Sequence, residues 1–203
     1  TETASVSVTV NPINDAPAVT NVITAVSEEG LTGGIQDTTG NVAGADTTNA
    51  VSVSGSIATD PDSTLTVTLT APSVPLTSGG VAIAWSGTGT AASPLIGSAG
   101  SVEVLRASVN SSGTYTITLS QPVDHAAGNG ENVRTLTFGV SASDGVAASA
   151  TGTITLNIED DSPTAVASTK TVTLPSVNTN IELILDVSGS MEIGRASCRE
   201  RVS

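Results

Sequence analysis

The amino-acid sequence predicts an all-β protein built as an antiparallel β-sandwich. Its central part contains three runs in which apolar and small polar residues alternate, at residues 115–119, 136–140 and 154–158. Alternation with a period of two places the apolar side chains on one face of a strand and the polar ones on the other. Because the chain holds one Trp, one Tyr and one Phe, its core must be filled mainly by smaller aliphatic residues, and the β-branched ones among them favour sheets.

Further short strands are predicted along the chain, each bounded by residues that favour turns. The first is expected near residues 19–26, before a long irregular loop rich in Gly, Thr and Asn. The apolar positions that follow predict strands at 51–58, 64–71, 81–85 and 102–108. An Asn-Ser-Ser-Gly turn at residues 110–113 then leads into the three central runs.

The charge balance is strongly acidic, with 19 Asp and Glu against six Lys and Arg and a net charge of -13. Nucleic acid is excluded as a partner, because phosphate binding requires clustered basic residues. Many of the acids lie at turns and strand ends, which favours binding of divalent metal, whereas solubility alone is the plainer explanation of the charge. Cys198 is the single cysteine, so no disulfide within the chain is expected.

Two acidic groups lie next to predicted strands in the first third of the chain. Asp60 and Asp62 flank a proline between two strands, where both carboxylates could face one cation or each could cap its own turn. Glu28 and Glu29 follow the first predicted strand. We regard all four as candidate calcium ligands.

Neither of the two places that suggest catalysis or sugar binding supports that function. Asp124 and His125 are adjacent, but neighbours on an extended segment point to opposite faces, and no motif places a nucleophile beside them. We interpret them as part of a hydrogen-bonded loop. Trp85 alternates with Val81 and Ile83, so we interpret it as a packing residue and not as a platform for a sugar. The chain is therefore not expected to be an enzyme.

The strand that runs into Asn-Pro-Ile-Asn-Asp-Ala-Pro at residues 11–17 resembles the closing linker of cadherin-like bacterial repeats. The resemblance implies that Asn14 and Asp15 donate oxygens to a calcium ion between domains, and calcium accepts carboxylate, amide and backbone oxygens in flexible geometry. The alternative is a plain proline-ended turn. The chain opens inside an alternating apolar run, so we expect it to be an internal fragment of a longer protein.

A second resemblance covers residues 18–164. The segments VDHAAGNGEN, SASDG and IEDDSP occur there in this order, and this combination is similar to the repeat of giant type I secreted, RTX-like adhesins of Gram-negative bacteria. The resemblance implies an immunoglobulin- or cadherin-like extender module, stacked in tandem and stiffened by calcium at its junctions. It places the outgoing junction at Glu159, Asp160 and Asp161. Asp144 stands alone in a turn where many such repeats carry two or three acids.

The fold class is predicted to change near the C-terminus. The apolar run at residues 181–187 predicts a buried parallel strand, and it ends in Asp186, Ser188 and Ser190. This Asp-x-Ser-x-Ser motif resembles the first metal-binding segment of a von Willebrand factor type A domain. The resemblance implies a magnesium site, which is incomplete here because later ligands of that family are missing.

The composition of the last 12 residues predicts that they are a foreign segment. Three of the six basic residues and the single cysteine lie there, and the segment resembles the translation of a sequencing adapter; a short basic helix is the alternative. We therefore divide the chain as follows: the end of a preceding module and linker (1–17), the β-sandwich (18–164), the linker and first strand of a truncated type A domain (165–191), and the foreign segment (192–203).

These observations predict a non-enzymatic, calcium-stiffened extender segment of a bacterial surface adhesin. It would present a type A domain for cell adhesion or biofilm formation, at the cell surface or outside the cell. Its expected partners are neighbouring repeats and an unknown surface protein or glycan, with no membrane insertion in this fragment. The alternative is a carbohydrate- or ice-binding sandwich, suggested by Thr114, Thr116 and Thr118 on one strand face.

Overall fold

The computed structural model describes residues 13–36, 47–126, 132–147 and 149–161. Contacts divide the chain into two units, Thr1–Thr164 and Ala165–Ser203, and all described residues belong to the first. The predictions for the strand preceding residue 11, for the type A segment and for the foreign segment lie outside the described residues.

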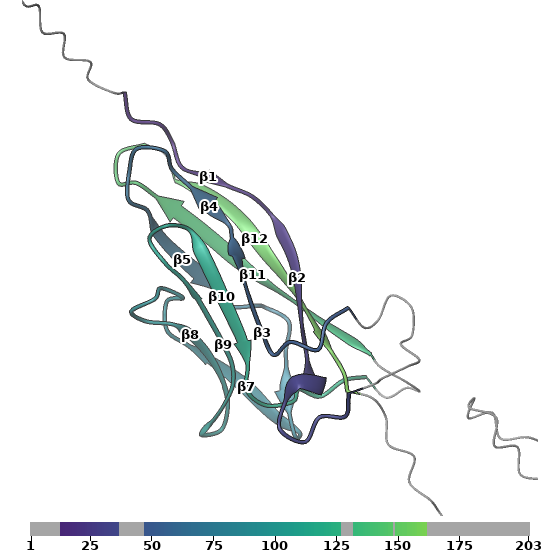
Figure 1. The fold of residues 1–203 in the computed structure, drawn as a ribbon. Coiled ribbons are helices and arrows are strands. Elements are labelled where there is room, and N and C mark those ends of the chain that lie inside the picture. The colour runs from purple at the N-terminus through teal and green to yellow at the C-terminus, as the bar shows by residue number, and fades with distance from the viewer. Residues whose placement is uncertain (1–12, 37–46, 127–131, 148, 162–203) are drawn as a thin grey trace, which may run out of the picture. The chain divides into compact units, whose positions relative to one another are not determined.

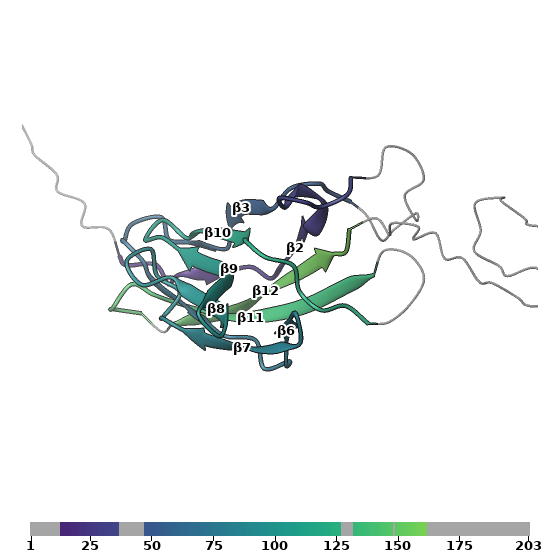
Figure 2. The same ribbon diagram turned by 90° about the horizontal axis from the view of Figure 1, so that it is seen from below.

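The described part is an all-β sandwich, as predicted, made of two larger sheets that lie against each other (Figures 1 and 2). One sheet has four strands in the order β2-β12-β11-β5. The other has six in the order β3-β10-β9-β8-β7-β6, and β1 pairs with β4 in a separate two-stranded sheet. All strand pairs are antiparallel except β12 with β2, which run parallel.

The four-stranded sheet contains the longest strands. It is formed by β2 (Val22–Ser27), β5 (Thr66–Thr70), β11 (Val133–Ser143) and β12 (Ala150–Glu159). The hairpin of β11 and β12 has a continuous register from Val133 opposite Glu159 to Ala142 opposite Ala150. Because Glu159 and the β11–β12 turn lie at opposite ends of this hairpin, it defines the two ends of the sandwich.

In the six-stranded sheet, β6 to β10 follow one another as consecutive hairpins, and β3 pairs with β10 at the edge. Its strands are β3 (Ser52–Ser56), β6 (Thr77–Ser78), β7 (Val81–Ser86), β8 (Leu95–Ala99), β9 (Val102–Val109) and β10 (Thr114–Leu119). The small sheet pairs β1 (Ala18–Val19) with β4 (Ala58–Thr59). The predicted turn at residues 110–113 joins β9 to β10.

The core lies between the two larger sheets and consists mostly of aliphatic side chains. The three alternating runs of the sequence face inward as predicted, and their apolar residues are at most 5% exposed: Tyr115, Ile117, Leu119, Leu136, Phe138, Val140, Ile154, Leu156 and Ile158. Trp85 is partly buried and packs edge-on against Phe138, with ring centroids 5.7 Å apart. This contact confirms that Trp85 is a packing residue.

Several details differ from the prediction. The region expected as one strand at residues 19–26 is divided into β1 and β2, because β1 pairs with β4 in the small sheet whereas β2 pairs with β12 in the four-stranded sheet. The predicted loop after β2 begins with a short 3-10 helix, η1 (Glu28–Gly30), which Ser27 caps by accepting the amide of Glu29. Strands β6 and β8 were not predicted. Within the described residues, no helix has the length and apolarity needed to cross a membrane.

Candidate metal centre

The structure brings the candidate ligands of the sandwich into two groups. Near the turn between β11 and β12 lie Asn14, Asp15, Asp60, Asp62 and Asp144, which we call the turn-end group. At the other end of the β11–β12 hairpin lie Glu28, Glu29, Glu159, Asp160 and Asp161, which we call the exit-end group. The remaining candidates, Asp186, Ser188 and Ser190, lie outside the described residues.

Hydrogen bonds connect most of the turn-end group across segments that are distant in sequence. Asn14 Nδ2 donates to Asp144 Oδ2 at 2.7 Å, and the Ser63 hydroxyl donates to Asn14 Oδ1 at 3.2 Å. The backbone amide of Asp15 donates to Asp62 Oδ2 at 3.2 Å. The chain that enters the sandwich at residues 14–15 is therefore attached to both neighbouring turns.

Asp60 caps its own turn, as one of the two interpretations of that turn proposed. Its Oδ1 accepts the backbone amides of Asp62 at 3.1 Å and Ser63 at 3.0 Å. Its Oδ2 is shielded from solvent and has no hydrogen-bond partner among the described residues. The carboxylate thus keeps one oxygen available for a cation or a water molecule.

Asp144 is held by hydrogen bonds that favour its charged form. The side-chain amide of Asn14 has the largest effect, and the backbone amides of Val146 and Ala147 also donate to the carboxylate. Together they hold the pKa of Asp144 below its ordinary value. Both carboxylate oxygens of Asp144 therefore accept hydrogen bonds from within the sandwich.

The three consecutive acids of the exit-end group, residues 159–161, lie in different environments. Glu159 is 2% exposed, and its carboxylate accepts the Thr47 amide at 3.0 Å, the Thr47 hydroxyl at 2.5 Å and the Thr48 amide at 3.1 Å. The backbone amide of Asp161 donates to Asp160 Oδ1 at 3.0 Å. Glu159 therefore binds the segment at residues 47–48, while Asp160 belongs to a different cluster.

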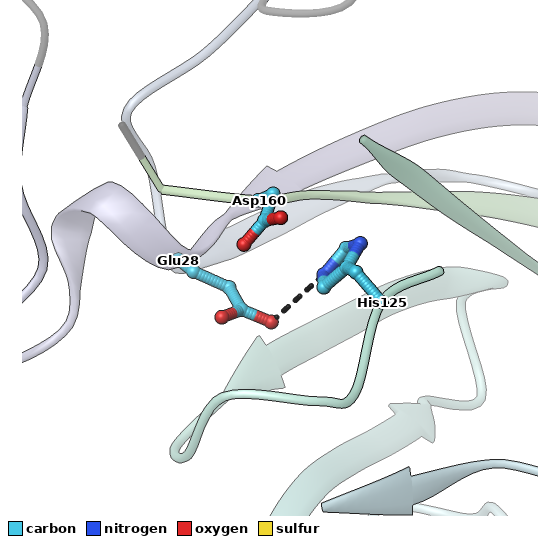
Figure 3. A group of neighbouring side chains, drawn as sticks. All are labelled: Glu28, His125 and Asp160. Atoms are coloured by element: carbon cyan, nitrogen blue, oxygen red, sulfur yellow. Dashed lines mark hydrogen bonds and ion pairs between the residues drawn. The ribbon is translucent and has the colours of Figure 1, made fainter. Parts of the chain in front are cut away.

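That cluster contains Glu28, His125 and Asp160 (Figure 3). Glu28 comes from η1, His125 from the segment after β10 and Asp160 from the residue that follows β12. One ligand atom from each lies within 4.8 Å of the other two, and no other such group of three His, Cys, Asp or Glu occurs in the described part of the chain. Sequence reasoning missed His125 as a member, because its partner Glu28 is 97 positions away.

Glu28 and His125 are fixed in a buried environment. Their side chains are each 6% exposed, and His125 Nε2 lies 3.0 Å from Glu28 Oε1. The same carboxylate oxygen accepts the backbone amide of Val123 at 2.7 Å. Asp124 faces elsewhere, since its Oδ2 accepts the amide of Gly80 at 2.8 Å, and the expected divergence of Asp124 and His125 is confirmed.

Burial and charge act in opposite directions on the ionisable groups of this cluster. Burial lowers the pKa of His125, but the hydrogen bond to Glu28 and the charges of Asp160 and Glu28 outweigh it, so the pKa is raised. Burial raises the pKa of Asp160, and the charge of His125 offsets this only in part. The cluster therefore holds two carboxylates with one imidazole where water is largely excluded.

Comparisons of the chain with models of protein families, with curated proteins and with solved structures find no match.

Proposed function

We propose that the sandwich is a calcium-stiffened extender module of a large secreted bacterial adhesin, in which it holds a von Willebrand factor type A domain away from the cell. The observation that carries the proposal is that candidate ligands gather at both ends of the β11–β12 hairpin, with Asn14, Asp62 and Asp144 linked by hydrogen bonds to the entering chain at one end and Glu28 and Asp160 at the other. Strand β12 has 10 residues, which at ~3.3 Å per residue separates the two groups by about 30 Å. Modules joined through such ends would stack lengthwise.

The position of the chain at each end supports end-to-end joining. Residues 14–15 enter beside the turn between β11 and β12, where Asn14 contacts Asp144. The chain leaves the sandwich after Glu159, at the other end of the same hairpin. A preceding module would therefore meet the turn-end group, and a following module would meet the exit-end group.

The turn-end residues offer the kind of ligands that calcium prefers. Asp60, Asp62 and Asp144 supply carboxylate oxygens from two turns, and Asp60 Oδ2 is shielded and has no partner in the described part. Calcium takes six to eight such oxygens, including water and backbone carbonyls. The remaining ligands would come from water and from the neighbouring module.

The mechanism is electrostatic and mechanical. Uncompensated carboxylates at a junction between two acidic modules repel one another. The chain has a net charge of -13 and only six Lys and Arg to offset the repulsion. A bound calcium ion would remove the repulsion and restrict the angle between modules. The module would then act at the cell surface or outside the cell, in adhesion or biofilm formation, with a protein or glycan as the target of the type A domain.

The experiment that tests the proposal is thermal unfolding of the chain in calcium and in chelator, together with small-angle scattering in both. Extracellular calcium modules bind with dissociation constants of ~0.1–1 mM. At 10 mM calcium this corresponds to a stabilisation of about 1.4–2.7 kcal/mol. Asp60→Asn and Asp62→Asn should reduce the shift in melting temperature, whereas Glu103→Gln, which alters the ion pair with Arg106 and changes no member of either group, should not. Equal melting temperatures and equal dimensions in calcium and chelator would contradict the proposal.

A second candidate function rests on the outer face of β3 and β10. Ser52, Ser54 and Ser56 lie opposite Thr118, Thr116 and Thr114 in the register of the two strands. The hydroxyls of Ser52 and Thr118 are 2.9 Å apart, and those of Ser54 and Thr116 are 3.3 Å apart. A regular array of hydroxyls suits direct contact with a carbohydrate or with ice. A glycan array and an ice-affinity assay test it, and loss of binding in Thr116→Val would support it.

A further inference from the structure

Folding brings one nitrogen ligand and two carboxylates together at the exit end of the sandwich. Glu28, His125 and Asp160 are distant in sequence, but their side chains point toward one another (Figure 3). The closest pair is His125 Nε2 and Glu28 Oε1 at 3.0 Å, and all three ligand atoms lie within 4.8 Å of one another. Three different segments thus contribute one donor each to a common point.

The distances match those that a small divalent ion requires. Zinc binds imidazole nitrogen and carboxylate oxygen at ~2.0–2.2 Å in tetrahedral geometry, so two ligands of one ion lie about 3.4 Å apart. The observed separations, from 3.0 Å to within 4.8 Å, bracket this value, and rotation of the side chains would close the difference.

The donor set also distinguishes between metals. Calcium and magnesium prefer oxygen ligands, whereas imidazole suits zinc and other first-row transition ions. We propose that Glu28, His125 and Asp160 form a binding site for a first-row divalent transition ion such as Zn²⁺. Three protein ligands leave a fourth position for water. This site is separate in its chemistry from the calcium junctions, and the inference stands whether or not the calcium proposal does.

A second observation on His125 supports the site. Its side chain is 6% exposed and Nε2 faces Glu28, while Nδ1, on the other side of the ring, is buried and has no hydrogen-bond partner among the described residues. A buried polar atom left unsatisfied requires an explanation such as an ion or an ordered water. When Nε2 binds a metal ion, Nδ1 is the ring nitrogen that donates to such a water and so fixes the orientation of the imidazole.

The charges around the cluster favour a cation. With a neutral imidazole, Glu28 and Asp160 together carry a charge of about -2 when both are ionised. Asp161 adds negative charge near Asp160. Arg134 acts in the opposite direction on His125, but its guanidinium donates to the carbonyl of Pro75 at 2.7 Å and is not paired with either carboxylate of the cluster in the described structure. The carboxylates therefore exceed the local positive charge.

The experiment is a titration of the full chain with Zn²⁺, followed by ¹⁵N NMR of selectively labelled histidine. The chain contains a single histidine, so the imidazole signals report on this site alone, even if Zn²⁺ also binds elsewhere. We expect the Nε2 signal of His125 to shift and to saturate at one equivalent. Millimolar Ca²⁺ should leave it in place. If 1 mM Zn²⁺ leaves the Nε2 signal of the wild-type protein unchanged, the proposal is overturned.

Variants separate a built site from binding to one histidine. Glu28→Gln and Asp160→Asn keep the shape of each side chain. Each should weaken Zn²⁺ binding by at least ~10–100-fold, since this much is lost even when a residue that only hydrogen-bonds a metal ligand is mutated. Asp161→Asn, one residue away, is the matched control: it removes a nearby charge but no ligand, and should weaken binding far less than either cluster variant. If the two cluster variants bind Zn²⁺ as tightly as the control, the ion is held by His125 alone and the proposed site is refuted. Calcium-dependent stiffening with no zinc response would refute this site and leave the calcium proposal intact.

Discussion

Glu159 offers the sharpest distinction between a structural carboxylate and a metal ligand. The sequence resemblance implies that it contributes to a calcium junction, whereas the structure buries it and pairs it with Thr47 and Thr48. We predict that Glu159→Ala destabilises the sandwich by the same amount in calcium and in chelator. The reason is that its three hydrogen bonds lie within the module and involve no ion.

The magnitude follows from those three contacts. A hydrogen bond to a charged group contributes about 1.5–3 kcal/mol, but Thr47 is exposed, so water can replace part of what is lost. We therefore expect a net cost of about 2–4 kcal/mol for Glu159→Ala. For a protein of this size that corresponds to a fall in melting temperature of roughly 5–15 °C. Glu159→Gln should cost less, because its amide oxygen can still accept a hydrogen bond.

The assay is urea unfolding followed by the fluorescence of Trp85, the single tryptophan. Its partly buried position against Phe138 makes the emission sensitive to loss of the core. The control is Glu103→Gln, which removes a 2.7 Å pair with Arg106 whose side chains are 33% and 43% exposed, and which should cost no more than about 1 kcal/mol. A destabilisation by Glu159→Ala that appears in calcium and disappears in chelator would refute the structural role.

Two further predictions concern turns. Gly113→Ala should destabilise the sandwich strongly, because Gly113 has a φ of +76° and an added Cβ would lie 1.8 Å from the carbonyl oxygen of Ala58. The control is Gly100→Ala, at a φ of +62° with open space around it, which should cost only ~1–2 kcal/mol of backbone strain. Equal losses of unfolding free energy for the two variants in urea would contradict the steric argument. For Asp144, whose pKa is lowered first by the hydrogen bond from Asn14, the stabilisation is present above its ordinary pKa of ~3.9 and is lost as the pH falls through the lower folded-state value. Asn14→Ala should raise that pKa, as measured by the chemical shift of the carboxyl carbon, and an unchanged titration would show that the contact is absent in solution.

The strands of the sandwich could be predicted where alternation was strong. Residues 115–119, 136–140 and 154–158 lie inside β10, β11 and β12, with their apolar members buried. In these runs each residue's own character decides which face it takes, so local pattern is sufficient. Strand β11 extends beyond the predicted run 136–140 at both ends, because its pairing with β12 continues where the hydrophobic pattern stops.

Strand β8 could not be predicted because its residues depend on distant neighbours. It contains Gly97, which is a weak strand former, and Gly97 lies opposite Trp85 in the adjacent strand. A Cβ at this position would approach the Trp85 ring to 2.9 Å. The glycine thus makes room for a large side chain on β7, and this requirement is visible only once the two strands are paired.

A similar limit applies to the register of β9. Val104 and Leu105 are consecutive and both are 0% exposed, which contradicts simple alternation. The ladder with β8 shifts here, from Gly97 opposite Leu105 to Ser98 opposite Glu103. Val104 is the extra residue of this bulge, and its carbonyl accepts the amide of Ser120 at 2.8 Å. The pairing partner therefore decides which side chains of β9 enter the core.

Local sequence was also insufficient to predict which candidate metal residues share a site. The acidic residues could be placed near strand ends from the sequence, but adjacency was a poor guide to which of them share a site. Glu159 binds residues 47–48 and Asp160 faces Glu28 and His125, although the two acids are neighbours. Successive side chains of an extended segment point in opposite directions, so a run of acids divides between two environments. A ligand set is instead assembled where separate segments end at the same edge, and for that reason Asp160 finds its imidazole partner in the loop after β10 and not in the acids beside it.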